Sequence, residues 1–203
     1  MSAPPAPATG ARLDLGVLAG TRWIGEAAMT AGGVAHVALG PWIVGASGRW
    51  SWGVRNHGLA QVRLTDIDGR AVAAGYKLSA TELGVDLGRQ ARLGPVEVTA
   101  LVGPRIAKLS QDLALTITDA RPMAPPDPGP INLQTRDTRT VRLGGGLRAL
   151  WAQSARLRMT IEVDASIDLA DDAGDHAVPT VATPALATWA LAVSLGGQFQ
   201  VWP

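Results

Sequence analysis

Residues 157–169 read Leu-Arg-Met-Thr-Ile-Glu-Val-Asp-Ala-Ser-Ile-Asp-Leu, the clearest strand pattern in the sequence. Every second residue, starting at Leu157, is apolar, and every residue between is charged or carries a hydroxyl group. Successive side chains of a strand point to opposite faces, whereas a helix repeats its apolar residues at intervals of three and four. The stretch therefore predicts an amphipathic β-strand.

The same alternation recurs along most of the chain. In the last segment, the odd positions are mostly large and apolar, and most even positions are small or polar. Sorting the whole sequence by parity predicts eight strands. These strands cover residues 12–23, 34–39, 42–52, 82–90, 96–106, 141–151, 157–169 and 188–202.

The connections between these strands alternate in length. Tight turns are expected at residues 39–41, 93–95 and 153–155, and longer loops rich in Pro, Gly, Asp and Thr at residues 24–33, 54–80, 110–139 and 170–187. Short turns on one rim and long loops on the other are typical of an up-and-down meander. The sequence thus predicts an all-β, antiparallel, eight-stranded barrel at residues 11–203, after a flexible Pro/Ala-rich leader at residues 1–10.

Composition excludes several classes of function. Eighteen basic and 17 acidic residues leave a net charge of +1 with no basic block, so we expect no nucleic-acid partner. The chain has no cysteine, and His36, His57 and His176 lie far apart, so we expect neither a metal site nor a cofactor. Two long stretches, residues 27–48 and 176–203, lack charged residues, but glycine and proline interrupt both, which argues against a helical membrane span.

The polar face of the strands decides which side of the barrel is the inside. It carries seven arginines and seven acids: Arg12, Asp14, Arg22, Arg49, Glu82, Asp86, Glu97, Arg105, Arg142, Arg148, Arg158, Glu162, Asp164 and Asp168. Paired arginines and carboxylates, with few lysines, suit a confined interior better than a surface in water. We therefore predict a transmembrane barrel with a charged lumen; the alternative is a soluble, lipocalin-like barrel that binds an apolar ligand inside.

Aromatic residues cluster near the predicted strand ends. They are Trp23, Trp42, Trp50, Trp52, Trp151, Trp189, Phe199 and Trp202. Aromatic residues at strand ends form girdles at the two membrane interfaces, although they can also cap the core of a soluble barrel at its rims.

With these features the chain resembles the small eight-stranded outer-membrane β-barrels of Gram-negative bacteria, of the OmpA-transmembrane and OmpX type. The resemblance covers about residues 11–203, including a last strand ending in Gly-Gly-Gln-Phe-Gln-Val-Trp-Pro. Pro203 and Pro104 depart from the pattern, and Pro104 predicts a bulge or a strand end. The resemblance implies an outer-membrane protein in contact with lipid and lipopolysaccharide. We expect a monomer, and the Ala/Gly/Arg-rich composition resembles high-GC proteobacterial or myxobacterial members.

For function, the sequence predicts a plugged lumen and a structural, anchoring or loop-mediated binding role, with a protein partner at the long loops. A narrow channel and a lipid-modifying enzyme are the alternatives. The enzyme would need His57 with Ser51 or Ser79, or His176 with Asp175, and we expect no catalytic residue among them. Gly144–Gly146 lie inside a strand pattern, which indicates close packing or a bulge and not a phosphate loop. The alternating residues 61–67 predict a hairpin that extends two strands beyond the membrane.

Overall fold

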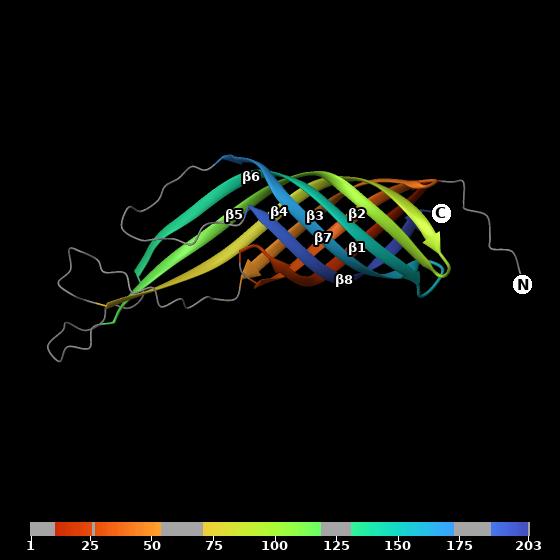
Figure 1. The fold of residues 1–203 in the computed structure, drawn as a ribbon. Coiled ribbons are helices and arrows are strands. Elements are labelled where there is room, and N and C mark those ends of the chain that lie inside the picture. Colours follow the sequence, from red (N-terminus) through yellow and green to blue (C-terminus); the bar gives the residue numbers. More distant parts are fainter. Residues whose placement is uncertain (1–10, 26, 54–70, 119–130, 173–187, 203) are drawn as a thin grey trace, which may run out of the picture.

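Eight antiparallel strands close into a barrel in which each strand pairs with its sequence neighbours and β8 pairs with β1 (Figure 1). The computed structural model describes residues 11–25, 27–53, 71–118, 131–172 and 188–202. The strands are β1 (Ala11–Trp23), β2 (Ala27–Leu39), β3 (Trp42–Gly53), β4 (Ala71–Leu93), β5 (Val96–Thr118), β6 (Ile131–Ala152), β7 (Leu157–Asp172) and β8 (Trp189–Trp202). The predicted fold class is confirmed. Over the described ranges, no helix is long and apolar enough to cross a membrane.

Several strands are longer than predicted. β2 starts at Ala27 and not at residue 34, because residues 27–33 pair with β1 and residues 28–33 also pair with β3. Five of these seven residues are Ala or Gly, which give little alternation in the sequence. β4, β5 and β6 also extend into segments predicted as loops, so the intervals 54–80 and 110–139 are only partly connections. The predicted leader and the hairpin at residues 61–67 lie outside the described residues.

The extra length of β4, β5 and β6 projects from the long-loop end of the barrel. The last pair between β3 and β4 is Trp52 with Ser79, yet β4 continues to Ala71 while paired with β5. These three strands leave the barrel together (Figure 1). A membrane crossing needs about 9–11 strand residues, so strands of 22 and 23 residues reach well beyond it.

Pro104 lies inside β5 and causes neither the predicted bulge nor a strand end. The ladder with β4 lapses between the pairs Gly84–Arg105 and Leu87–Val102, but the register is the same on both sides of the gap. On the other edge, Pro104 remains opposite Leu143 of β6. Proline has no backbone N–H to donate, and the strand accommodates this by losing local pairing with β4 while keeping its pairing with β6.

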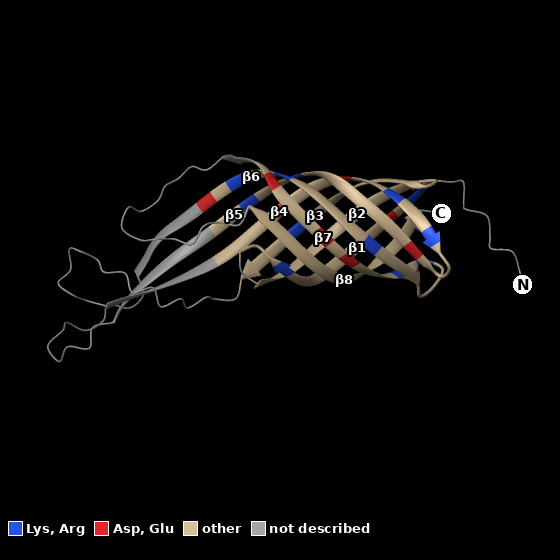
Figure 2. Ribbon diagram, in the orientation of Figure 1, with Lys and Arg blue, Asp and Glu red and all other residues tan. Residues whose placement is uncertain are grey.

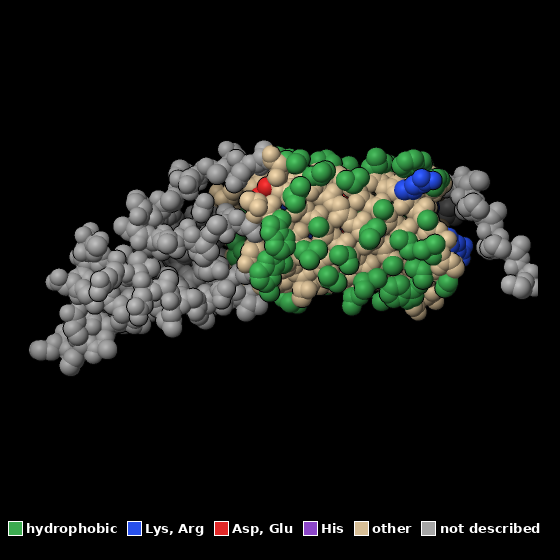
Figure 3. Space-filling view, in the orientation of Figure 1, with side chains coloured by type: hydrophobic (Ala, Val, Ile, Leu, Met, Phe, Trp, Pro, Cys, Tyr) green, Lys and Arg blue, Asp and Glu red, His purple; other side chains and the backbone are tan. Residues whose placement is uncertain are grey.

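The two faces of the barrel wall have opposite chemistry. Large apolar side chains point outward, as Val17 does with 70% exposure, whereas the lumen-facing Arg142 is 1% exposed. Apolar side chains are spread over the visible outer wall, with backbone and small side chains between them (Figure 3), and charged positions occur along the strands (Figure 2). On β6 the outward residues between Arg139 and Trp151 are all apolar or glycine. A continuous outward-facing apolar band is the arrangement of a transmembrane barrel. A soluble barrel needs its apolar face inside, so the soluble alternative is wrong.

Candidate functional site in the barrel lumen

All fourteen charged residues predicted for the lumen lie on the inner face of the wall. Four of them form a short-turn cluster near the chain termini: Arg12, Asp14, Glu97 and Arg158. The other ten form a central network: Arg22, Arg49, Glu82, Asp86, Arg105, Arg142, Arg148, Glu162, Asp164 and Asp168. Each group contains as many arginines as carboxylates, so the interior is electrically balanced.

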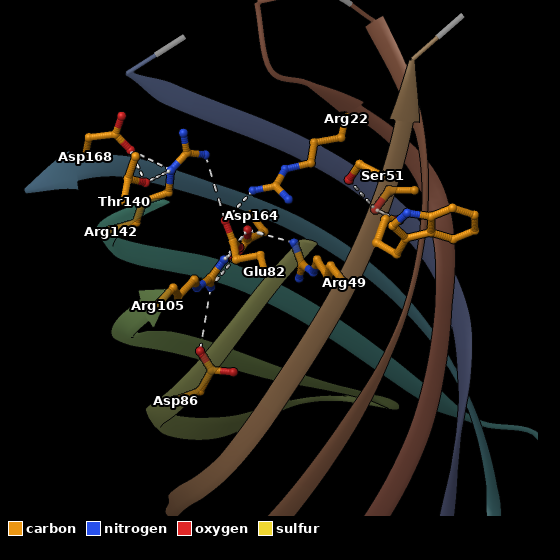
Figure 4. Close-up of polar contacts among 12 residues, drawn as sticks. Arg22, Arg49, Ser51, Glu82, Asp86, Arg105, Thr140, Arg142, Asp164 and Asp168 are labelled. Carbon is orange, nitrogen blue, oxygen red and sulfur yellow. Dashed lines mark hydrogen bonds and ion pairs between the residues drawn. The ribbon is translucent and has the colours of Figure 1, made fainter. Parts of the chain in front are cut away.

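Asp164 of β7 is the centre of the network (Figure 4). Arg105 of β5 donates to both of its carboxylate oxygens, at 2.6 and 2.5 Å. Arg49 of β3 donates to Oδ1 from the other side, at 2.7 Å. A bidentate arginine–carboxylate pair fixes both groups in orientation as well as in distance.

Glu82 of β4 connects this centre to the long-loop end. It accepts hydrogen bonds from Arg22 at 2.5 Å and from Arg105 at 3.1 Å. Arg142 lies 3.9 Å from Glu82, and its Nε donates to Asp168 at 2.5 Å. The carboxylate of Glu82 is therefore surrounded by three guanidinium groups, which offsets the cost of burying its charge.

His36 is a member of the network that sequence reasoning missed. Arg148 Nη1 lies 2.9 Å from His36 Nδ1, while Arg148 Nε donates to Glu162 at 2.6 Å. On its other side, His36 Nε2 is 4.0 Å from a carboxylate oxygen of Asp86. The alternation along β2 could have predicted this position, because His36 lies on the same inner face of the strand as Thr30.

These contacts bridge the lumen along three of its four strand diameters. Strands four places apart in the ring face each other across the barrel. Arg12 of β1 pairs with Glu97 of β5 at 2.9 Å, His36 of β2 contacts Arg148 of β6, and Arg49 of β3 pairs with Asp164 and Glu162 of β7. On the fourth diameter, the inner face of β8 is lined by Ala, Ser, Gly and Gln. An eight-stranded barrel is only wide enough for its own side chains, and here they meet in the middle.

Glycines on the inner wall make room for the large polar side chains. A Cβ on Gly144 would overlap the guanidinium of Arg105, and one on Gly45 would overlap the His36 ring. Neither position can carry a side chain while these groups keep their places. Close packing is therefore the observed role of Gly144, and it explains a glycine inside a strand.

The two ends of the lumen differ in character. Toward the long loops, an apolar cluster closes the interior above the central network: Ile24, Ala28, Leu78, Ala80, Ala107, Leu109 and Ala190. Toward the short turns, Arg12 and Glu97 keep 18% and 22% of their side-chain area exposed. Water reaches the charges from the short-turn end, whereas buried apolar side chains line the lumen at the other end.

Most of the predicted interface aromatics point outward at the two rims. Trp23, Trp50 and Trp189 are about half exposed at the long-loop end, where the rings of Trp50 and Trp52 lie 4.7 Å apart. Trp42 and Phe199 are about half exposed at the short-turn end, and Trp151 is half-buried there. Trp202 ends β8. Two aromatic levels separated by an apolar band match the girdles of a membrane barrel.

Each pair considered for catalysis includes a residue outside the described ranges, and of these residues the structure describes Ser51 and Ser79. Ser51 is fully buried, and its hydroxyl donates to Thr30 Oγ1 at 3.1 Å. Ser79 lies within β4, opposite Trp52. His57, Asp175 and His176 lie outside the described residues. Within the described residues, no group of three or more His, Asp or Glu side chains could hold a metal ion.

The sequence matches no family model and no curated protein. In three dimensions the chain is similar to a major outer membrane protein from Thermus thermophilus, with a TM-score of 0.55 and 18% identity over 94% of this chain and 99% of that chain. The fold is that of an outer-membrane β-barrel. Neisserial surface protein A aligns with a TM-score of 0.49 and 7% identity over 94% and 99% of the two chains. Ail, the attachment invasion locus protein of Yersinia pestis, aligns at 0.40 and 10% identity over 94% and 96%.

Proposed function

We propose that this chain is an integral outer-membrane protein whose lumen is closed and whose activity lies in anchoring or binding at the long-loop end. Support for the membrane location comes from the outward apolar band between two aromatic levels, and from the barrel fold shared with the Thermus outer membrane protein. In this role the protein is a monomer in contact with membrane lipid, including lipopolysaccharide on its outer side.

The bridging of three lumen diameters carries this proposal. The partly exposed Arg12–Glu97 pair and the buried Arg49–Asp164 pair each join opposite walls, so a solute would have to break both ion pairs to pass. Breaking one buried pair costs about 3–5 kcal/mol. Ile24 and Leu109, each 1% exposed, close the long-loop end with apolar side chains. A diffusive channel and a catalytic lumen are both less compatible with this packing.

Conductance tests the closed lumen. The wild-type barrel, refolded in detergent and reconstituted in a planar bilayer, should show no open-pore current steps. A barrel with the paired substitution Arg49→Ala and Asp164→Ala should still fold, because the two opposite charges leave together. Its membranes should leak small ions more than wild type does. Stepwise currents of pore size from the wild-type barrel would refute the closed lumen.

The projecting part of β4, β5 and β6 favours binding at the long-loop end. At its base, Lys108 pairs with Asp137 at 2.8 Å, and both side chains are about half exposed. Because Lys108 and Asp137 are charged and point outward, they mark the long-loop end of the apolar band. If a protein partner binds here, deleting residues 59–72 should abolish its capture on the refolded barrel while heat-modifiable gel migration is unchanged. Equal capture by the deletion variant would refute loop-mediated binding.

A further inference from the structure

The outer rim at the short-turn end carries unbalanced positive charge. Arg89, Arg92 and Arg156 are all exposed there. The acids at this end, Asp14 and Glu97, point into the lumen, where they pair with Arg12 and Arg158. Blue side chains accordingly stand at this end of the molecule, and no red ones are visible there (Figure 3).

Arg89 lies at the boundary between this basic rim and the apolar band. It is opposite Trp42 in the β3–β4 ladder, and its Cζ lies 5.9 Å from the centroid of the Trp42 ring. This distance is within the range of a cation–π contact. Two residues further into the band, Leu87 and Val44 are opposite each other, and both are about half exposed.

Among the described residues no carboxylate pairs with Arg89. An arginine on the outer wall can bind phosphate oxygens with several N–H donors. The Trp42 ring holds the guanidinium at the edge of the band, at the depth of lipid head groups.

We propose that Arg89 and Trp42 form a binding site for the head-group phosphate of an anionic phospholipid in the periplasmic leaflet. The acyl chains would lie along the exposed surface of Leu87 and Val44, which is continuous with the lipid-facing wall. Arg92, three residues nearer the turn, lies on the other face of β4 and donates to the backbone oxygen of Gly94 at 3.3 Å, so Arg89 is the arginine of this site. A lipid fits better than a protein partner because the site opens directly onto the apolar band. The short turns of such barrels face the periplasm, so the site rests on the membrane location proposed above.

Native mass spectrometry of the full chain, refolded in detergent, tests this site. Phosphatidylglycerol and phosphatidylcholine with identical acyl chains are titrated separately, and the bound fraction is measured for each lipid. The variants are Arg89→Gln and Trp42→Leu. The matched control is Arg139→Gln, which removes an exposed arginine from the outer wall at the opposite rim. Heat-modifiable gel migration verifies that every variant is folded.

The wild type should bind phosphatidylglycerol more tightly than phosphatidylcholine. Arg89→Gln should weaken phosphatidylglycerol binding about fivefold, which corresponds to about 1 kcal/mol for one arginine near an anionic lipid surface. Trp42→Leu should weaken it in the same direction, and Arg139→Gln should leave it unchanged. Equal binding of the two lipids by wild type, unchanged binding by Arg89→Gln, or an equal loss in Arg139→Gln would each overturn the site. Failure of the wild type to fold in detergent would instead refute the membrane location.

Discussion

Arg49 of β3 and Asp164 of β7 lie on opposite walls of the barrel, and their side chains meet at 2.7 Å inside it. The two residues are 115 positions apart in the sequence, and both side chains are almost completely buried. Arg49 also contacts Glu162, so one guanidinium joins one wall to two acids on the other. This crossing makes the lumen charges a structural core for a barrel that has its apolar side chains on the outside.

Removing the positive charge at this crossing should destabilise the barrel. We expect Arg49→Met to lower the free energy of unfolding by about 3 kcal/mol, because two buried carboxylates lose a partner while Arg105 and Arg148 still neutralise them in part. The measurement is urea unfolding in lipid vesicles. Lys108→Met is the control, since it breaks an exposed pair and should cost less than about 1 kcal/mol. Equal effects of the two substitutions would contradict a core role for the network.

Gly144 should tolerate no side chain. Gly144→Ala places a Cβ where the Arg105 guanidinium lies, so Arg105 must move away from Asp164. We expect a loss of stability of about 1–3 kcal/mol, typical of overpacking in a filled interior. Gly33→Ala is the matched control, because its nearest neighbour, a backbone oxygen, would lie at 3.7 Å. The same urea transitions compare the two variants, and a neutral Gly144→Ala would show that Arg105 has free space.

A charged substitution on the outer wall should destabilise the barrel more, the deeper it lies in the apolar band. Leu147→Arg introduces a guanidinium into the apolar band and should cost about 2–4 kcal/mol, whereas Leu93→Arg, at the short-turn rim, should cost about 0–1 kcal/mol. Both leucines are at least 60% exposed, so neither substitution disturbs internal packing. Folding yield and urea unfolding in vesicles report the difference. Equal costs at the two positions would place the bilayer elsewhere.

Asp137 should respond to the loss of its neighbour. The hydrogen bond from Lys108, followed by one from Ser110, holds the pKa of Asp137 below its usual range. A lowered folded-state pKa means that the pair stabilises the fold above the ordinary carboxyl pKa, and that this effect disappears as the pH falls through the lowered value. In an NMR titration of the refolded barrel, Lys108→Met should raise the Asp137 pKa. The distant substitution Arg89→Gln should leave that pKa unchanged.

Alternation in the sequence was sufficient to predict the strand count, their order and the inward direction of all fourteen lumen charges, because each inner residue is flanked by outer ones. Residues 27–33 were predicted as a loop because five of the seven are Ala or Gly, which give little contrast between the two faces. Pairing partners in the lumen could not be predicted either. The odd or even position of a residue tells which face of its strand it lies on, but not how far along the barrel axis or where around the barrel it lies. The contact of His36 with Arg148 depends on strand tilt and register, so it could not be predicted.

The crossing of Arg49 to β7 also constrains how the protein can assemble. Glu162 and Asp164 follow Arg49 by more than a hundred residues, so the guanidinium has no opposite-wall acid to meet until the last strands arrive. A half-built sheet in hydrocarbon would expose these charges, at a cost of several kcal/mol each. We therefore expect the ion pairs of the lumen to form in the same cooperative step in which β8 pairs with β1 and closes the barrel. Partly inserted intermediates should be sparse, and the barrel should enter the bilayer as it closes.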